Sequence, residues 1–404
     1  MNLPTTVLDH NDTQAYIATR ALLDERQERG TLLPSRMETL HKKVSDIHTA
    51  LDPQDTDRPL NQSLLRYVNG QAALAFRRPE AGTWEDPQSF TGSALSQLGY
   101  KVLGGGGTKY MESLRHEGDT GRKLAEVNWA FSLQSQTKPS LLRTIQLPGV
   151  QGRTIRAVLS GGGTGYSVID NIDILNLFLE SPEIAHLPVI EANITPDSMR
   201  LRLLLNPEDA AMFDPITGKL RNPGSSHFVG LDLPIPMIEI WNGEIGNSAV
   251  RIQWGTYFVR CLNGLMGYEG GANYRWNHSG GDDRADRIKA GLGDAIKSAR
   301  VEAAGQVQDY KVATEIAVDD ASALLDTWGE RDLTRDQLQG AKDALQDETT
   351  YPGRRLASVV DAITLMAQGE SDLRRQRDLE AFAARILQKG LEKGRKDRRI
   401  QIAA

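Results

Sequence analysis

The chain has 404 residues, of which 39% are hydrophobic and 25% are charged. This balance is ordinary for a globular protein of two or three units and excludes a wholly disordered chain. No apolar run approaches the roughly 18 residues that a membrane-spanning helix needs, and the N-terminal residues lack the pattern of a secretory signal. A single cysteine, Cys261, excludes an internal disulfide, so we expect a reducing compartment, with an extracellular protein that lacks disulfides as the alternative.

The net charge of −6 is unevenly distributed along the chain. Residues 66–160 and 349–404 each carry a net charge of +5, whereas residues 161–285 and 286–348 carry −7 and −6. Because salt screens charges beyond about 10 Å, a local basic surface can bind phosphates even on an anionic molecule. The two basic segments therefore keep nucleic acid open as a partner.

Residues 1–65 are predicted to form an N-terminal helical segment that ends in a linker. Residues 13–30 and 36–51 have the apolar spacing of amphipathic helices. Ser35 and Glu38, at the start of the second helix, have the spacing of a capping box. Residues 52–63 are rich in Asp, Asn and Pro and are predicted to be a polar linker.

Residues 66–285 are predicted to form an α+β core domain around a central, mostly antiparallel sheet with short helices. Pro79 to Pro87, with Gly82 between them, is predicted to be a break in the regular structure. From about residue 121 to residue 280, apolar and polar residues alternate with the period of two that is typical of strands. The segments in which this pattern predicts strands are 126–131, 153–159, 199–205, 236–241 and 250–262. One short helix is expected over 172–179, with Asp170 or Asn171 as its cap. Strands with so few helices between them favour an α+β fold over a βαβ repeat.

Residues 286–404 are predicted to form a helical C-terminal region with a basic tail. The first helix covers about residues 284–316, and later helices begin near Asp320, Thr334, Arg354 and Asp372. The last helix ends in six basic residues, Lys389, Lys393, Arg395, Lys396, Arg398 and Arg399. Such an end is either a solvated helix terminus or a nucleic-acid contact.

No motif indicates a metal site, a cofactor or a catalytic residue. The seven histidines are isolated from one another, and one cysteine cannot make a zinc ribbon. Gly104–Gly107 and Gly161–Gly165 are predicted to be loops, with phosphate contact as an alternative, because Gly107-Thr108-Lys109 has the wrong order for a P-loop. A nuclease is a further alternative, if the fold gathers Asp170, Asp173 and Glu244 around a divalent ion.

Aromatic and basic residues alternate near the end of the predicted core. Trp254, Tyr257, Tyr274 and Trp276 are interleaved with Arg251, Arg260, Arg275 and His278. Aromatic faces stack on bases and guanidinium groups hold phosphates, which is how proteins bind single-stranded nucleic acid. Alternatively, Trp254 and Tyr257 pack inside the sheet, whereas Tyr274 and Trp276 lie near glycines and are equally consistent with an exposed loop.

Three stretches resemble the phage/plasmid-like protein family, a domain of unknown function found in phages, prophages and conjugative plasmids. The first runs from Arg156-Ala157-Val158-Leu159-Ser160 through Tyr166 to Asp170-Asn171-Ile172-Asp173. The second comprises residues 244–248, Arg260-Cys261-Leu262-Asn263-Gly264 and Arg275-Trp276-Asn277-His278. The third is Asp361-Ala362-Ile363-Thr364 with Leu379-Glu380. The resemblance covers about residues 90–390, and the five residues between Ser160 and Tyr166 exceed the family's usual spacing.

The resemblance implies a protein of a mobile genetic element, located in the cytoplasm of a bacterial host cell, whose family has no established enzyme activity. We expect it to bind single-stranded DNA in replication or recombination, and annealing of strands is left open. On that basis Lys101, Lys109, Arg153 and Arg156 are expected to contact phosphates. Arg275, Trp276 and His278 are expected at the strand-binding surface together with Arg260 and Tyr166, and Asn263 is expected to shape a turn. Such proteins act as homo-oligomers because cooperative coverage of a strand needs repeated sites. The alternative partner is a host protein, bound by an anti-defence factor through the acidic regions.

Overall fold

The computed structural model describes residues 36–68, 71–78, 80–113, 120–134, 139–147, 150, 152–160, 166–195, 197–206, 234–246, 248–258, 263–267, 274–278, 284–346, 354–370 and 373–401. The helix predicted over 13–30, the glycines at 161–165 and Arg260 lie outside these ranges. None of the helices in the described ranges combines the length and the hydropathy that crossing a membrane requires.

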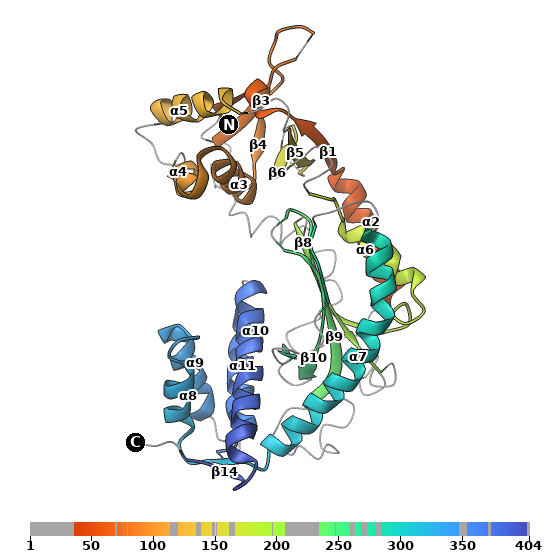
Figure 1. Cartoon of the computed structure of the whole chain (residues 1–404), viewed down its shortest axis with the longest axis vertical. Coiled ribbons are helices and arrows are strands. Elements are labelled where there is room, and N and C mark those ends of the chain that lie inside the picture. The colour runs from red at the N-terminus through yellow and green to blue at the C-terminus, as the bar shows by residue number, and fades with distance from the viewer. Residues whose placement is uncertain are drawn as a thin grey trace, which may run out of the picture.

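A first sheet of six strands occupies one end of the molecule (Figure 1). Its order is β1-β5-β6-β4-β3-β2, with β1 (Gln54–Arg58), β2 (Ser63–Val68), β3 (Gln71–Phe76), β4 (Gln88–Phe90), β5 (Ser140–Ile145) and β6 (Thr154–Ser160). Helices α3 (Gly92–Leu103), α4 (Gly107–Glu112) and α5 (Thr120–Ser132) pack on one face. Leu74, Leu98 and Phe131 lie in the core between them.

A second sheet of six strands forms the middle of the molecule. Its order is β11-β10-β9-β8-β7, with β12 paired to β10. The strands are β7 (Val189–Ile194), β8 (Ser198–Leu204), β9 (Pro234–Gly243), β10 (Val250–Phe258), β11 (Asn263–Met266) and β12 (Tyr274–Trp276). One face packs on α2 (Met37–Leu51), α6 (Asn171–Glu180) and the long α7 (Arg284–Ala313) through Leu201, Ile238, Ile252 and their neighbours.

The opposite face of the second sheet is called here the inner face. Helices α10 (Leu356–Gly369) and α11 (Leu373–Gly394) stand on this side, across the sheet from α7 (Figure 1). Together with α8 (Ala321–Gly329) and α9 (Arg335–Gln346) they build a separate apolar core. The short strands β13 (Ala317–Val318) and β14 (Arg399–Ile400) pair in parallel at the base of these helices. The two ends of the molecule curve toward the same side (Figure 1).

The predicted α+β class is confirmed, and within the described residues of the two large sheets only β4 and β6 pair in parallel. The helix expected over 36–51 is α2, and the short capped helix is α6, where Asp170 and Asp173 form a capping box. The C-terminal helices begin close to the predicted positions.

Three expectations need correction. Residues 126–131 belong to helix α5, because Val127 and Phe131 are buried one helical turn apart and the alternation between them is incidental. Residues 54–58 form strand β1, which is exposed on both faces and so lacks an apolar period. The core holds two sheets where one was expected, and the predicted boundary at residues 65 and 66 falls inside β2.

Candidate nucleic-acid interface

The first two stretches of the family resemblance meet where the two sheets join. This junction cluster consists of Arg143, Arg156, Tyr166, Asp170 and Glu244. Arg156 Nη1 donates to Glu244 Oε2 at 2.6 Å, and Arg143 donates to Asp170 and to the backbone carbonyl of Glu244. Tyr166 Oη donates to the same carbonyl at 2.9 Å. Side chains from β5, β6 and the end of β9 therefore fasten the first sheet to the second.

The junction cluster balances buried charges. Burial alone would lower the pKa of the Arg143 guanidinium, but the nearby carboxylates of Asp170, Glu244 and Asp55 outweigh burial and raise it. Burial raises the pKa of the Glu244 carboxyl, and Arg156 limits that rise. Carboxylates held by arginines are poor metal ligands. Correspondingly, no group of three or more His, Cys, Asp or Glu in the described ranges is placed to hold a metal ion.

His278 stacks on the ring of Tyr166 and belongs to the same structural unit. The ring centroids are 4.8 Å apart with an interplanar angle of 8°. The backbone N–H of Ser167 donates to the carbonyl of His278 at 2.6 Å, which ties β12 to the segment before α6. His278 is 6% exposed, so it lies behind the surface rather than on it.

The four residues expected to contact phosphates do not share one surface. Arg156 is buried in the junction cluster, and Arg153 pairs with Asp52 at 2.7 Å. Lys101 is half-buried and donates to the carbonyl of Leu159 at 2.8 Å. Burial lowers the pKa of the Lys101 ammonium, and Asp57 partly offsets that effect. Lys109 alone of the four is exposed.

The glycines at 104–107 have a packing role in the structure. A Cβ atom on Gly107 would lie 1.9 Å from the carbonyl oxygen of Gly99, so α3 and α4 can touch only because both residues lack side chains. Gly104 has a φ of +76° at the end of α3. Close packing of two helices therefore explains Gly107, and the positive φ explains Gly104.

The second sheet separates the aromatic residues from the arginines. Trp254, Tyr274 and Trp276 pack on the face that α7 covers, and Tyr257 is buried on the inner face beneath α11. Arg275 alternates with its two aromatic neighbours, so it points to the inner side and is exposed. The predicted Arg275–Trp276 surface is thus divided between two faces. Asn263 begins β11, and its backbone pairs with Phe258.

The inner face changes in character along the strands. Beneath α11 it is apolar, with Leu204, Met237 and Tyr257. The next row is an inner ion cluster, defined as Glu191, Arg200, Arg202, Glu239, Arg377 and Glu380. Arg202 donates to Glu239 at 3.0 Å, to Glu191 at 3.1 Å and to Glu380 of α11. Arg377 lies at the solvent edge of the cluster, 3.6 Å from Glu239.

Beyond the ion cluster, three arginines and a tryptophan follow one line across four strands. In the strand registers Arg200 of β8 is opposite Trp241 of β9, Trp241 is opposite Arg251 of β10, and Arg251 is opposite Arg275 of β12. Residues directly opposite in paired strands point to the same face. With strands about 4.8 Å apart, this arginine row is on the order of 14 Å long.

Burial along the arginine row decreases from one end to the other. Arg200 is 1% exposed and bonds Glu191, yet its Nε and Nη1 atoms have no hydrogen-bond partner in the described part of the chain. Arg251 is half-buried and Arg275 is exposed. In the sequence, the only signal for this surface is the alternation of Arg200 and Arg202 with apolar residues. The register that aligns four strands cannot be predicted from such a linear pattern.

A comparison with known proteins finds no family model, no curated protein and no solved structure that matches this chain. The resemblance to the phage/plasmid-like family, and the mobile-element origin it implies, stay predictions. What the structure defines is an α+β protein with two large sheets, a charged junction between them, and an inner face that carries an ion cluster and a row of arginines.

Proposed function

We propose that the protein binds single-stranded nucleic acid, without catalysis, along the inner face of its second sheet. The arginine row carries this proposal. Arg251 and Arg275, which are opposite each other in paired strands, present guanidinium donors to neighbouring phosphates, and the buried Arg200 continues the row beneath the surface. A sheet face also gives an extended strand a surface to follow.

The charges around the arginine row favour an anionic ligand. The ion cluster beside it is balanced, since Arg200, Arg202 and Arg377 face Glu191, Glu239 and Glu380. Arg275, which is exposed, and its register partner Arg251 lie beyond this balanced cluster on the same face. An anion that approaches this end of the inner face therefore meets guanidinium groups, although the chain as a whole is anionic.

The role of each residue follows from its exposure. Arg275 and Arg251 are placed to take the first phosphates. Arg200 is 1% exposed and pairs with Glu191, so it lies beneath the surface and is not expected to contact a phosphate. Trp241 is 6% exposed and supports the arginines by packing between them rather than by stacking on a base. Binding of this kind reads the backbone and is insensitive to base sequence.

The test is fluorescence anisotropy with a labelled single-stranded oligonucleotide over a range of salt concentrations. Each phosphate neutralised on a single strand contributes about −0.7 to the slope of log K against log salt, so the two accessible arginines predict a slope of about −1.4. Arg251→Ala combined with Arg275→Ala is expected to weaken binding and to remove most of this salt dependence.

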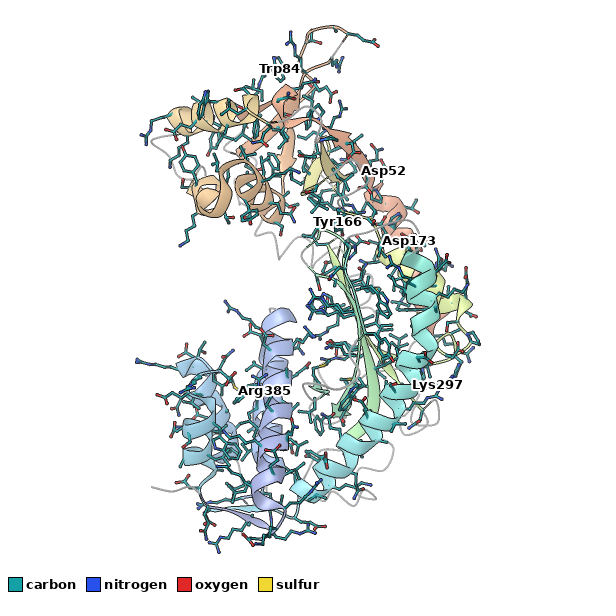
Figure 2. All side chains as sticks on the ribbon, viewed as in Figure 1. Asp52, Trp84, Tyr166, Asp173, Lys297 and Arg385 are labelled. Carbon is teal, nitrogen blue, oxygen red and sulfur yellow. The ribbon has the colours of Figure 1, made fainter. Side chains whose placement is uncertain are left out.

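The matched control is Lys297→Ala combined with Arg300→Ala, which removes the same charge from the exposed side of α7 (Figure 2). This control is expected to bind almost as the wild type does. No binding at about 50 mM salt, or equal losses in the two double variants, would refute the proposal. In the first case a host protein becomes the better candidate partner.

A further inference from the structure

An exposed tryptophan surrounded by arginines lies at the far end of the first sheet, away from the inner face. Figure 2 places Trp84 at the end of the molecule that is remote from α10 and α11. It lies in the hairpin between β3 and β4, which the sequence pattern marked only as a proline-rich break. The Trp84 side chain is 38% exposed.

The hairpin that carries Trp84 is fixed by backbone hydrogen bonds. Arg77 and Trp84 form a β-bridge, and the N–H of Arg78 donates to the carbonyl of Thr83 at 2.7 Å. The N–H of Glu85 donates to the carbonyl of Phe76 at 2.8 Å. Gly82 has a φ of +63° in open surroundings, which lets the chain turn there. The tryptophan is therefore held in place by the loop itself.

One cation lies over the ring, and two further arginines are exposed on the same hairpin. The Arg66 guanidinium lies 5.9 Å from the Trp84 ring centroid, within cation–π range. Arg77 and Arg78 are exposed on the same hairpin. Arg58 pairs with Glu85 at 3.3 Å, but Arg66, Arg77 and Arg78 make no ion pair with any described residue. The hairpin thus combines an accessible aromatic ring with guanidinium groups that form no ion pair with a carboxylate among the described residues.

We infer that Trp84, Arg66, Arg77 and Arg78 form a second binding site, which takes an unpaired nucleotide. The base stacks on the exposed part of the Trp84 ring, and Arg77 and Arg78 hold the phosphate. The ligand must be both aromatic and anionic to use all of these groups, which favours a nucleotide over an acidic peptide. The ligand class is the one proposed for the inner face, but the residues and the observations are different.

The experiment measures the affinity of the full chain for a short labelled oligothymidylate and, separately, for thymidine monophosphate. The variants are Trp84→Ala, Trp84→Phe and, as a matched control, Trp129→Ala. Trp129 is 68% exposed on α5, and no arginine or lysine of the described structure lies over its ring. Stacking of one base contributes about 1–3 kcal/mol, so Trp84→Ala is expected to weaken oligonucleotide binding about 5- to 150-fold.

Trp84→Phe keeps an aromatic face and is expected to retain most of the affinity, and Trp129→Ala all of it. Photocrosslinking with a 5-iodouracil oligonucleotide is expected to mark Trp84 directly. Binding of the monophosphate that depends on Trp84 would identify a free nucleotide as the ligand. Binding of the oligonucleotide alone would identify an unpaired residue of a strand.

Failure of this inference is distinguishable from failure at the inner face. Oligonucleotide binding that needs Arg251 and Arg275 but is unchanged in Trp84→Ala would overturn the second site only. Binding that needs Trp84 but not the arginine row would support the second site and refute the inner-face proposal. Trp84-dependent binding of polyglutamate, with no nucleotide binding, would overturn the inference in favour of a protein partner.

Discussion

Replacing Arg202 by methionine removes the centre of the inner ion cluster while filling nearly the same space. Arg202 is fully buried and donates to Glu191, Glu239 and Glu380, which come from two strands and from α11. The variant leaves Arg200 and Arg377 to face three carboxylates, so one negative charge is in excess inside the protein. Breaking a buried ion pair in this way costs about 3–5 kcal/mol.

The pH dependence of this loss has a definite sign. Burial raises the pKa of the Glu380 carboxyl, and Arg202 limits the rise. Without Arg202 the native pKa of this carboxyl moves further above its unfolded value of about 4.3. The native state then binds protons more readily than the unfolded state, so the stability of the variant falls as the pH rises through that window. The deficit relative to wild type is expected to be larger at pH 8 than at pH 5.

The assay is urea unfolding followed by circular dichroism at both pH values, together with hydrogen exchange across α11. Because Glu380 is the contact of α11 with Arg202, exchange in this helix is expected to accelerate most. Arg377→Met is the control, because Arg377 is 22% exposed at the edge of the cluster and an ion pair there contributes about 1 kcal/mol or less. Arg202 does not have this role if the free energy of unfolding of Arg202→Met lies within about 1 kcal/mol of wild type at pH 8, or if the loss of stability does not depend on pH.

Three further predictions concern the first sheet and its helices. Gly107→Ala places a Cβ 1.9 Å from a backbone oxygen, so it is expected to lower the free energy of unfolding by about 1–3 kcal/mol in a urea titration. The control is Gly105→Ala, whose Cβ has nothing within 4 Å and should change this free energy by less than about 0.5 kcal/mol. Asn128 forms hydrogen bonds of 2.7 and 3.0 Å with the backbone of Leu65 on the edge strand β2. Asn128→Ala is expected to lower the free energy of unfolding by about 1–3 kcal/mol and, because it exposes the strand edge, to increase aggregation measured by light scattering. Unchanged stability would contradict this role. The pKa of Lys101 is lowered in the native state, so the native protein loses this proton at a lower pH than the unfolded chain does. The ionisation of Lys101 therefore increases the stability of the native state as the pH rises toward 10. Lys101→Met should lack this increase when the urea midpoints at pH 8 and pH 10 are compared.

Local signals in the sequence predicted the elements that are amphipathic or well capped. Helix α6 was predicted because Asp170 and Asp173 have capping-box spacing, and β8 and β10 because their apolar residues alternate. Strand β1 was missed because both of its faces meet water. Helix α5 was predicted to be a strand because Val127 and Phe131 fit both periods in a short window.

The candidate sites depend on distances that a linear pattern does not contain. Arg156 and Glu244 are 88 positions apart in the chain, yet their side chains are 2.6 Å apart. Arg275 was predicted to lie beside Trp276 on one surface, but the pleat sends the two side chains to opposite faces. Trp84 was overlooked because the prolines around it suggested only a break, whereas its exposure and its neighbour Arg66 come from the folded hairpin.

The parallel pairing of β13 with β14 bears on how the protein folds during synthesis. Ala317 and Val318 pair with Arg399 and Ile400, which are synthesised only after the four described helices that lie between them in the chain. Ile316 and Ile400 are both buried, and Gly394 packs closely against both side chains. A nascent chain that has reached α10 therefore still exposes Ile316. The packing of the helical region around Ile316 is therefore completed late in synthesis. A nonsense mutation before Arg399 is expected to leave this apolar residue exposed in a product that chaperones and proteases recognise.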